Sequence, residues 1–298
     1  MLFRSPVEQT ALAHDPVWPA QSADVRKLVG RGVAEPVSLI ELGVVHQGPG
    51  TVVSRVKALS LCVAEAETLD DLGVLGEALA SLQGYVLPCG SAGLAAAWAD
   101  AQGLHGDCTP MWRGVDGPVL IVSGSRNAAT LAQLQALYDA DSRLAWCELD
   151  VQAAERAVDQ AGRQAAEALR DGRNTVLSAS RGPLVPGAAA RTAGALGQAA
   201  LGATTSGALA RAAGRSLAGL VLTGGDTAMQ VCQALGIAAF SVVTAIEPGI
   251  PGSLAISGPL AGLPIVTKAG GFGSLQALRR AVEWIHTGQE PFGGDDAA

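Results

Sequence analysis

The chain has 298 residues, 49% of them hydrophobic and only 4% aromatic, with a formal net charge of −7 at pH 7. This length predicts two domains with substantial cores, and an acidic chain without a basic cluster is a poor candidate for binding nucleic acid. Five scattered cysteines without a CxxC pair indicate free thiols, and the lack of a signal peptide or of an apolar run of about 20 residues indicates a cytoplasmic protein that does not bind membranes.

The first third of the sequence alternates between strand-like and helix-like patterns. Apolar runs predict strands at 38–45, 60–67 and 85–90. Apolar residues at helical spacing predict helices at 51–59, 69–82 and 91–102. The glycine-rich stretch that follows predicts a linker. We therefore place a first domain at 1–105 and a linker at 106–117.

The rest of the sequence repeats this alternation. Strands are predicted at 118–124, 144–149, 174–180, 219–224, 238–246 and 263–268. Helices are predicted from after 124 to about 140 and at 150–170, 188–214 (as one helix or two), 226–236 and 274–287. Residues 247–262 are too rich in glycine and proline for a helix, so they form a hairpin or a loop over the ligand. The pattern predicts an α/β fold of two domains, each with a largely parallel sheet flanked by helices, the second at 118–290 with a disordered tail at 291–298.

Three strand-to-helix junctions in the second domain combine glycine with polar side chains. In the first, Ser123, Gly124 and Ser125 follow an apolar strand, and Asn127 can cap the next helix. Gly124 allows the backbone to approach a ligand closely, and Ser125 can donate its hydroxyl. A plain connection between a strand and a helix remains the alternative.

The second junction pairs two glycines with a helix start. Gly224 and Gly225 end a strand, and Asp226 and Thr227 open a helix whose exposed amides favour phosphate. Asp226 would repel a bare phosphate. It is therefore either a simple N-cap or a partner of Mg²⁺ or of a hydroxyl group.

The third junction places Lys268 before Gly270, Gly271 and Gly273, with Ser274 expected to cap the last helix. Lys268 beside a glycine loop suits a charge clamp on phosphate, although a lysine that points to solvent is the alternative. None of the three junctions matches the P-loop or the GxGxxG pattern. Together they are stronger evidence, because the carboxyl ends of parallel strands can converge on one site.

Several segments resemble a known family when they are taken in order. LTGGDTA (222–228), AIEPGIPG (245–252) and IVTKAGGFGS (265–274) resemble the nucleotide-binding domain of the four-carbon acid sugar kinase family, and VLIVSGSRN (119–127) resembles its opening strand. Upstream, segments 10–29, 63–72 and 89–99 resemble the later part of that family's sugar-acid-binding domain. The resemblance covers nearly the whole chain.

The resemblance implies ATP-dependent phosphorylation of a small sugar acid such as a threonate, an erythronate or a 3-oxo-tetronate. The ATP contacts of the family would fall on Ser125 with Ser123, on the turn 224–227 and on Gly270. Mg²⁺ neutralises phosphate charge and keeps several waters, so a single carboxylate can suffice. Asp226 is the first candidate to hold the metal, directly or through water, and is the one candidate catalytic residue. Glu247 is a second candidate, for ribose or metal.

The sequence departs from the family in one respect. The segment Asp-Asp-x-Thr-Gly-Ala, which supplies acidic groups to the family's substrate site, does not occur, so we expect the first domain to be incomplete. The sequence is then a truncated product, is completed by another polypeptide, or does not catalyse. Within the first domain, Asp15 and Ser22 could border the substrate, and Gly90 and Ser91 could bind its carboxylate, with rigid connection and helix capping as the alternatives.

An incomplete α/β domain should expose a sheet edge and apolar surface. We therefore predict a homo-oligomer, in the form of a dimer that exchanges elements between subunits. Two other functions compete with the kinase. A non-catalytic nucleotide-binding or carboxylate-binding module remains open, whereas the lack of GxGxxG disfavours a nicotinamide-dependent oxidoreductase.

Overall fold

The computed structural model divides the chain into two compact units, residues 1–107 and 108–298, and each is considered by itself. The residues it describes are 6–10, 13, 19–82, 84–104, 113–150, 155–181, 187–205 and 217–289. Residues 106–112 of the predicted linker and the predicted tail at 291–298 lie outside these ranges.

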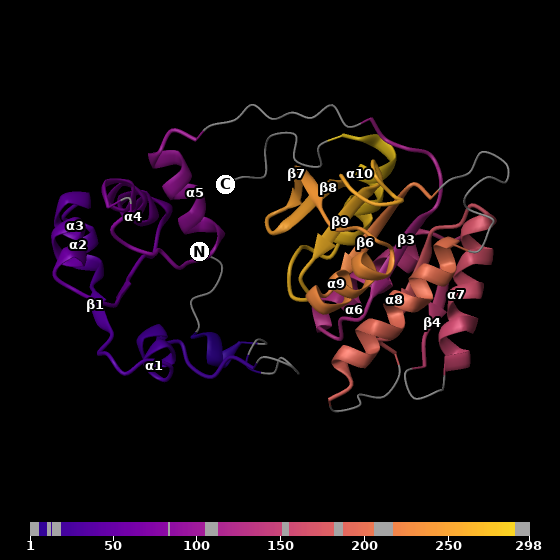
Figure 1. The fold of residues 1–298 in the computed structure, drawn as a ribbon, viewed down its shortest axis with the longest axis horizontal. Helices are drawn as coiled ribbons and strands as arrows, with labels where there is room; N and C mark the ends of the chain where they lie inside the picture. The colour runs from indigo at the N-terminus through magenta and orange to yellow at the C-terminus, as the bar shows by residue number, and fades with distance from the viewer. Residues whose placement is uncertain are drawn as a thin grey trace. The chain divides into compact units, whose positions relative to one another are not determined.

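The first unit is built around a short pair of parallel strands, β1 (Ser38–Ile40) and β2 (Cys62–Ala64), with Leu39 opposite Val63. Its helices are the 3-10 turn η1 (Val7–Gln9), α1 (Val25–Gly30), α2 (Leu42–Val45), α3 (Pro49–Lys57), α4 (Leu69–Ser81) and α5 (Ala92–Ala101) (Figure 1). Its small core joins the strands to α2, α3 and α4 through Ile40, Val45, Val52, Leu75 and Ala78.

All three predicted strands of this unit are wrong in part or in full. Only 38–40 of the predicted strand 38–45 and only 62–64 of the predicted strand 60–67 form strands. The first strand ends where α2 begins, and the Glu65 carboxylate caps α2 by accepting from the amide of Leu42 at 2.9 Å. Residues 85–90 form no strand. Tyr85 and Leu87 are 64% and 94% exposed, so this apolar run has no core to pack against, and Pro88 cannot donate to a strand ladder.

The second unit contains a seven-stranded sheet in the order β4-β5-β3-β6-β9-β8-β7. The five parallel strands are β3 (Val119–Ser123), β4 (Ala145–Glu148), β5 (Thr175–Ser178), β6 (Gly219–Thr223) and β9 (Pro264–Lys268). The antiparallel hairpin β7 (Phe240–Glu247) and β8 (Ile250–Ala255) extends one edge. Of the two alternatives for residues 247–262, a hairpin or a loop over the ligand, the structure has the hairpin. The predicted, largely parallel α/β fold is confirmed.

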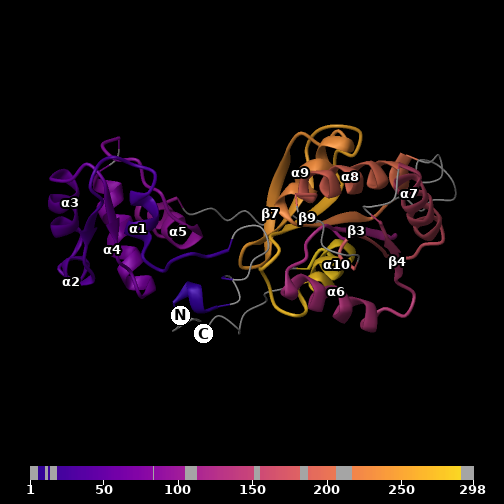
Figure 2. The same cartoon turned by 90° about the horizontal axis from the view of Figure 1, so that it is seen from below.

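Helices cover both faces of this sheet (Figure 2). One core cluster joins the sheet to α6 (Ala128–Ala140) and α10 (Ala277–Thr287). The other joins it to α7 (Glu155–Arg170), α8 (Ala189–Thr205) and α9 (Gly225–Ala234). Residues 206–214 of the predicted helical segment 188–214 lie outside the described ranges. Among the helices that the structure describes, none is both long and apolar enough to cross a bilayer.

Candidate functional site

The carboxyl ends of β3 and β6 form a topological switch point. The two strands are neighbours in the sheet, but α6, which follows β3, packs on one face, while α9, which follows β6, packs on the other. The two connections therefore leave in opposite directions, which is the arrangement that opens a crevice in open α/β sheets. Ligands of open α/β sheets bind at such a point.

The three glycine junctions meet at this crevice. A Cβ built on Gly124 would lie 2.2 Å from Thr227 Oγ1, and one built on Gly270 would lie 2.6 Å from Ser125 Oγ. The amide of Gly224 donates to the carbonyl of Lys268 at 2.9 Å, and Gly224 has a positive φ of 97°. Glycine at these positions therefore allows the three turns to pack against one another.

The amino terminus of α9 is open at the crevice. Gly224 is its N-cap, and the first intrahelical bond runs from the Ala228 amide to the Gly224 carbonyl. The amides of residues 225–227 thus have no partner within the helix and can bind an anion. A Cβ on Gly225 would meet nothing within 4 Å, so this approach is unobstructed.

Asp226 lies in the first turn of α9 and is exposed. The N-cap alternative for Asp226 is therefore wrong, since Gly224 holds that position. The carboxylate is free to take a ligand from solvent. Among the described residues, no group of three or more His, Cys, Asp or Glu could hold a metal ion, so a metal at Asp226 would take its other ligands from water and phosphate.

Lys268 is only 3% exposed, so the alternative of a solvent-facing lysine is wrong. Its Nζ donates to Thr130 Oγ1 at 3.1 Å and to the carbonyls of Ala269, Gly270 and Phe272 at 2.9, 3.1 and 3.0 Å. An ammonium group has three hydrogens, so this arrangement leaves none for a phosphate. Burial lowers the pKa of Lys268 to about 8, while the charge of Glu247 raises it.

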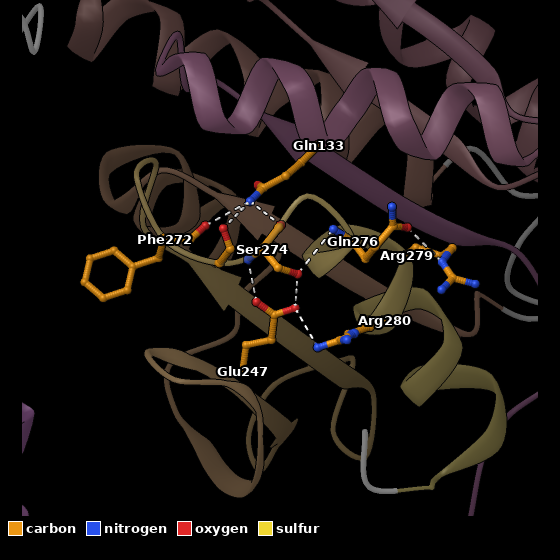
Figure 3. Close-up of polar contacts among 8 residues, drawn as sticks. Gln133, Glu247, Phe272, Ser274, Gln276, Arg279 and Arg280 are labelled. Carbon is orange, nitrogen blue, oxygen red and sulfur yellow. Dashed lines mark hydrogen bonds and ion pairs between the residues drawn. The ribbon is translucent and has the colours of Figure 1, made fainter. Parts of the chain in front are cut away.

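Glu247, at the end of β7, is 4% exposed and faces the third glycine loop (Figure 3). Its Oε2 accepts from the Ser274 amide at 2.6 Å, and its Oε1 accepts from Ser274 Oγ at 2.6 Å and from Arg280 Nη1 at 3.2 Å. These bonds tie the hairpin to the loop. Ser274 thus anchors Glu247, and the expected cap at Ser274 is wrong because Gln276 is the N-cap of α10.

The two serines of the first turn differ in exposure. Ser123 is fully buried, and its hydroxyl has no hydrogen-bond partner among the described residues. Ser125 is half-buried and accepts from the Asn127 amide at 3.3 Å. Asn127 caps α6 as predicted, accepting from the Ala129 amide at 3.0 Å. Of the two, Ser125 is the one that a ligand in the crevice could reach.

Thr130 and Gln133 of α6 were not singled out from the sequence. Both are buried polar residues that contact the third glycine loop. They are three residues apart and so lie on one face of the helix. Two polar side chains on the core face of the helix, beside the apolar Leu134 and Leu137, are the signal that could have identified them.

A row of polar residues crosses the carboxyl edge of the sheet. The final residues of five parallel strands lie side by side in register, namely Glu148, Ser178, Ser123, Thr223 and Lys268. At the end of this row, Glu148 accepts from the Arg181 amide and from Trp146 Nε1, and the Arg181 guanidinium lies 3.6 Å from the centroid of the Trp146 ring. Only Ser123 and Lys268 of this row were singled out from the sequence.

The candidate substrate residues of the first unit are not joined to one another. Asp15 lies outside the described residues. Ser22 Oγ accepts from the Asp24 amide at 3.1 Å. Gly90 and Ser91 are exposed at the start of α5, where Ser91 is the N-cap but makes no side-chain capping bond. No hydrogen bond of the described residues links Ser22 to this turn.

A histidine–aspartate pair in the first unit was also missed. His46 Nε2 lies 3.0 Å from Asp71 Oδ1, and Asp71 Oδ2 accepts from the amides of Glu67 and Thr68. The bond from the Glu67 amide, followed by those from Thr68 and the charge of His46, keeps the pKa of Asp71 below its usual range. This pair stabilises the start of α4, which begins with a capping box.

Comparisons with known proteins follow the division into two units. Residues 2–98 match the model of a sugar-binding N-terminal domain, and residues 120–278 match that of a nucleotide-binding C-terminal domain. The chain is similar to the D-threonate kinase of Bordetella bronchiseptica, with 32% identity over 290 residues that cover 94% of this chain and 64% of that protein. It is also similar to the 3-oxo-tetronate kinase of Methylobacterium radiotolerans, with 30% identity over 94% of this chain and 68% of that protein.

A solved structure shares the fold. The crystal structure of a Haemophilus influenzae protein matches 93% of this chain and 68% of its own, with a TM-score of 0.61 and 21% identity. The chain thus spans about two thirds of the length of the relatives that it matches.

Proposed function

Because the chain belongs to the four-carbon acid sugar kinase family, in which a sugar-binding domain precedes a nucleotide-binding domain, we propose that its second unit binds ATP in the crevice between β3 and β6. One observation carries this proposal. Three glycine junctions from separate parts of the sequence meet at the switch point, where Cβ atoms on Gly124 and Gly270 would collide with Thr227 and Ser125. Such close backbone packing beside a free helix amino terminus suits phosphate.

In this proposal the amides of residues 225–227 and the Ser125 hydroxyl hold the phosphates. Asp226, exposed at the start of α9, holds Mg²⁺ through water. Mg²⁺ would supply charge neutralisation to the β and γ phosphate oxygens. The protein's own part is to position the nucleotide, which is most of what phosphoryl transfer requires. Glu247 and Lys268 support the site through their bonds to the third loop.

The acceptor in this proposal is a four-carbon sugar acid. The relatives named D-threonate kinase and 3-oxo-tetronate kinase support this class of substrate. In the first unit, Ser22, Gly90 and Ser91 are the described candidates for contacts with the acid. The free amides at the start of α5 suit a carboxylate.

We also propose that the protein forms a homodimer. The strand β7 is the last of the sheet, and Phe240 and Val242 on it are 40% and 63% exposed. An edge strand that exposes apolar side chains, and whose one charged residue, Glu247, is buried, favours pairing with a second chain. Light scattering at micromolar concentration should give about twice the chain mass of 30.0 kDa. A stable monomer would contradict this part of the proposal.

A coupled assay of ADP release tests the reaction. The protein is incubated with Mg·ATP and a panel of four-carbon acids that differ in hydroxyl stereochemistry. We expect release of ADP to be stimulated by at least one acid. Binding of Mg·ATP without stimulation by any acid would instead favour a non-catalytic nucleotide-binding module, and binding of a nicotinamide dinucleotide in place of ATP would exclude both.

A further inference from the structure

The backbone of the third glycine loop, residues 269–274, turns its carbonyls toward α6 and the sheet. Lys268 Nζ and Thr130 Oγ1 donate to the first part of the loop. Gln133 Nε2, with two hydrogens, lies within hydrogen-bond distance of the carbonyls of Phe272, Gly273 and Ser274, at 3.0, 3.0 and 2.8 Å. In Figure 3 the Phe272 carbonyl points to Gln133 while its ring points away from the cluster. Three buried side chains, those of Lys268, Thr130 and Gln133, thus hold nearly the whole loop.

The orientation of the carbonyls fixes that of the amides. In a planar trans peptide, the C=O of one residue and the N–H of the next point in opposite directions. The inward carbonyls of Ala269, Gly270 and Phe272 therefore turn the amides of Gly270, Gly271 and Gly273 away from Lys268 and Gln133. Among the described residues, these three amides donate no hydrogen bond. Successive free amides form an anion-binding concavity.

This concavity adjoins the crevice. Gly270 packs against Ser125 of the first turn, since a Cβ on Gly270 would lie 2.6 Å from Ser125 Oγ. Lys268 in turn ends β9 and accepts, through its carbonyl, from the amide of Gly224 next to α9. The outward amides therefore belong to the same site as the amino terminus of α9.

We propose that Lys268 and Gln133 are positioning residues that lock the loop with its carbonyls inward, so that the amides of Gly270 and Gly271 bind the phosphates of the nucleotide. This inference rests on the proposed function of the crevice. Lys268 acts through the loop and does not touch the phosphates. Glu247 secures the far end of the loop through Ser274.

The residue types fit this role. The compact ammonium group of lysine offers three donors within a small volume, and the amide of glutamine offers two. Gln133 is 1% exposed and neutral, so it cannot act as a charge clamp on a phosphate. Its substitution therefore separates locking of the loop from direct attraction of an anion.

The test compares Gln133→Leu and Lys268→Met with the wild type in the full chain. Arg279→Ala serves as a control, because Arg279 makes an exposed bond to Gln276 beside the same loop. Amide hydrogen exchange without ligand should accelerate in residues 269–275 of both variants, while β3 and β6 remain protected. Calorimetry should then show about tenfold weaker binding of both Mg·ATP and Mg·tripolyphosphate, a difference of about 1.4 kcal/mol, because the lost contacts are to phosphate. The control should match the wild type in both measurements.

Two results would overturn the inference. One is a loop that exchanges faster in Gln133→Leu but binds both ligands with wild-type affinity. The other is a loss of affinity in Lys268→Met while Gln133→Leu binds normally, which would indicate a direct contact between lysine and phosphate. If the wild type itself binds neither ligand, the proposed nucleotide site fails, and the inference fails with it.

Discussion

Gly124 of the first turn packs directly against the second turn. A methyl group on Gly124 would lie 2.2 Å from Thr227 Oγ1. We expect Gly124→Ala to lower the free energy of unfolding by about 1–3 kcal/mol, the usual cost of overpacking, and to weaken ATP binding because the first and second turns are pushed apart. Chemical denaturation and calorimetry measure the two effects. Wild-type stability together with wild-type affinity would show that the two turns do not meet.

In the first unit, the charge of Asp71 predicts how stability depends on pH. Its bonds to the Glu67 and Thr68 amides and to His46 stabilise the start of α4, and we expect Asp71→Asn to lower the free energy of unfolding at pH 7. Because the pKa of the folded carboxyl is lowered, this stability is fully present above the unfolded pKa of about 4 and is lost as pH falls through the folded pKa. The difference between variant and wild type, measured in urea, should therefore shrink at pH 3. A difference that persists unchanged at pH 3 would rule out the charge as its cause.

Lys268 shows which features of a single residue can be predicted from the sequence and which cannot. A lysine at the end of a buried strand is unusual enough to be noticed from the pattern. Its partners are not, because they include Thr130 at a sequence separation of 138 residues and carbonyls whose direction depends on the path of the loop. The glycines of the three turns could be identified because each follows an apolar strand.

The hydrogen bonds between the β7–β8 hairpin and the third loop depend on Glu247. Glu247→Ala removes the acceptor for the Ser274 amide and hydroxyl. Since buried donors left without a partner cost about 1–3 kcal/mol, we expect a loss of stability in that range. The exposed Glu283→Ala on α10 serves as the control and should unfold like the wild type. Equal stability of the two variants would show that the tie contributes nothing.

Sequence patterns predicted the elements of the second unit well, because its strands are mostly apolar and most of them are separated by helices of ordinary length. The predicted strand at 85–90 shows the opposite case. Its composition resembles that of the other strands, but Leu87 is 94% exposed, since no neighbouring strand is available to pair with it. Whether an apolar run becomes a strand thus depends on the rest of the sheet, which local composition does not describe.

The two units of the chain have separate hydrophobic cores. The cluster around Ile40 and Val52 contains only residues of the first unit, and the two clusters of the seven-stranded sheet contain only residues of the second. We therefore expect a fragment of residues 113–289 to fold alone and to bind Mg·ATP within about threefold of the full chain, a difference of less than 1 kcal/mol. Circular dichroism and calorimetry on the fragment check this. An unfolded fragment would show that the second unit depends on the first.

Calorimetric titration of Mg·ATP into the wild type and Gly225→Val tests whether the nucleotide binds at the amino terminus of α9. A Cβ on Gly225 meets nothing within 4 Å, so the variant should melt within a few degrees of the wild type, while its side chain blocks the free amides of α9. We predict that the wild type binds one Mg·ATP per chain and that the variant binds it at least about tenfold more weakly, by 1.4 kcal/mol or more. Equal affinity in the two proteins would contradict the placement of the nucleotide at this crevice.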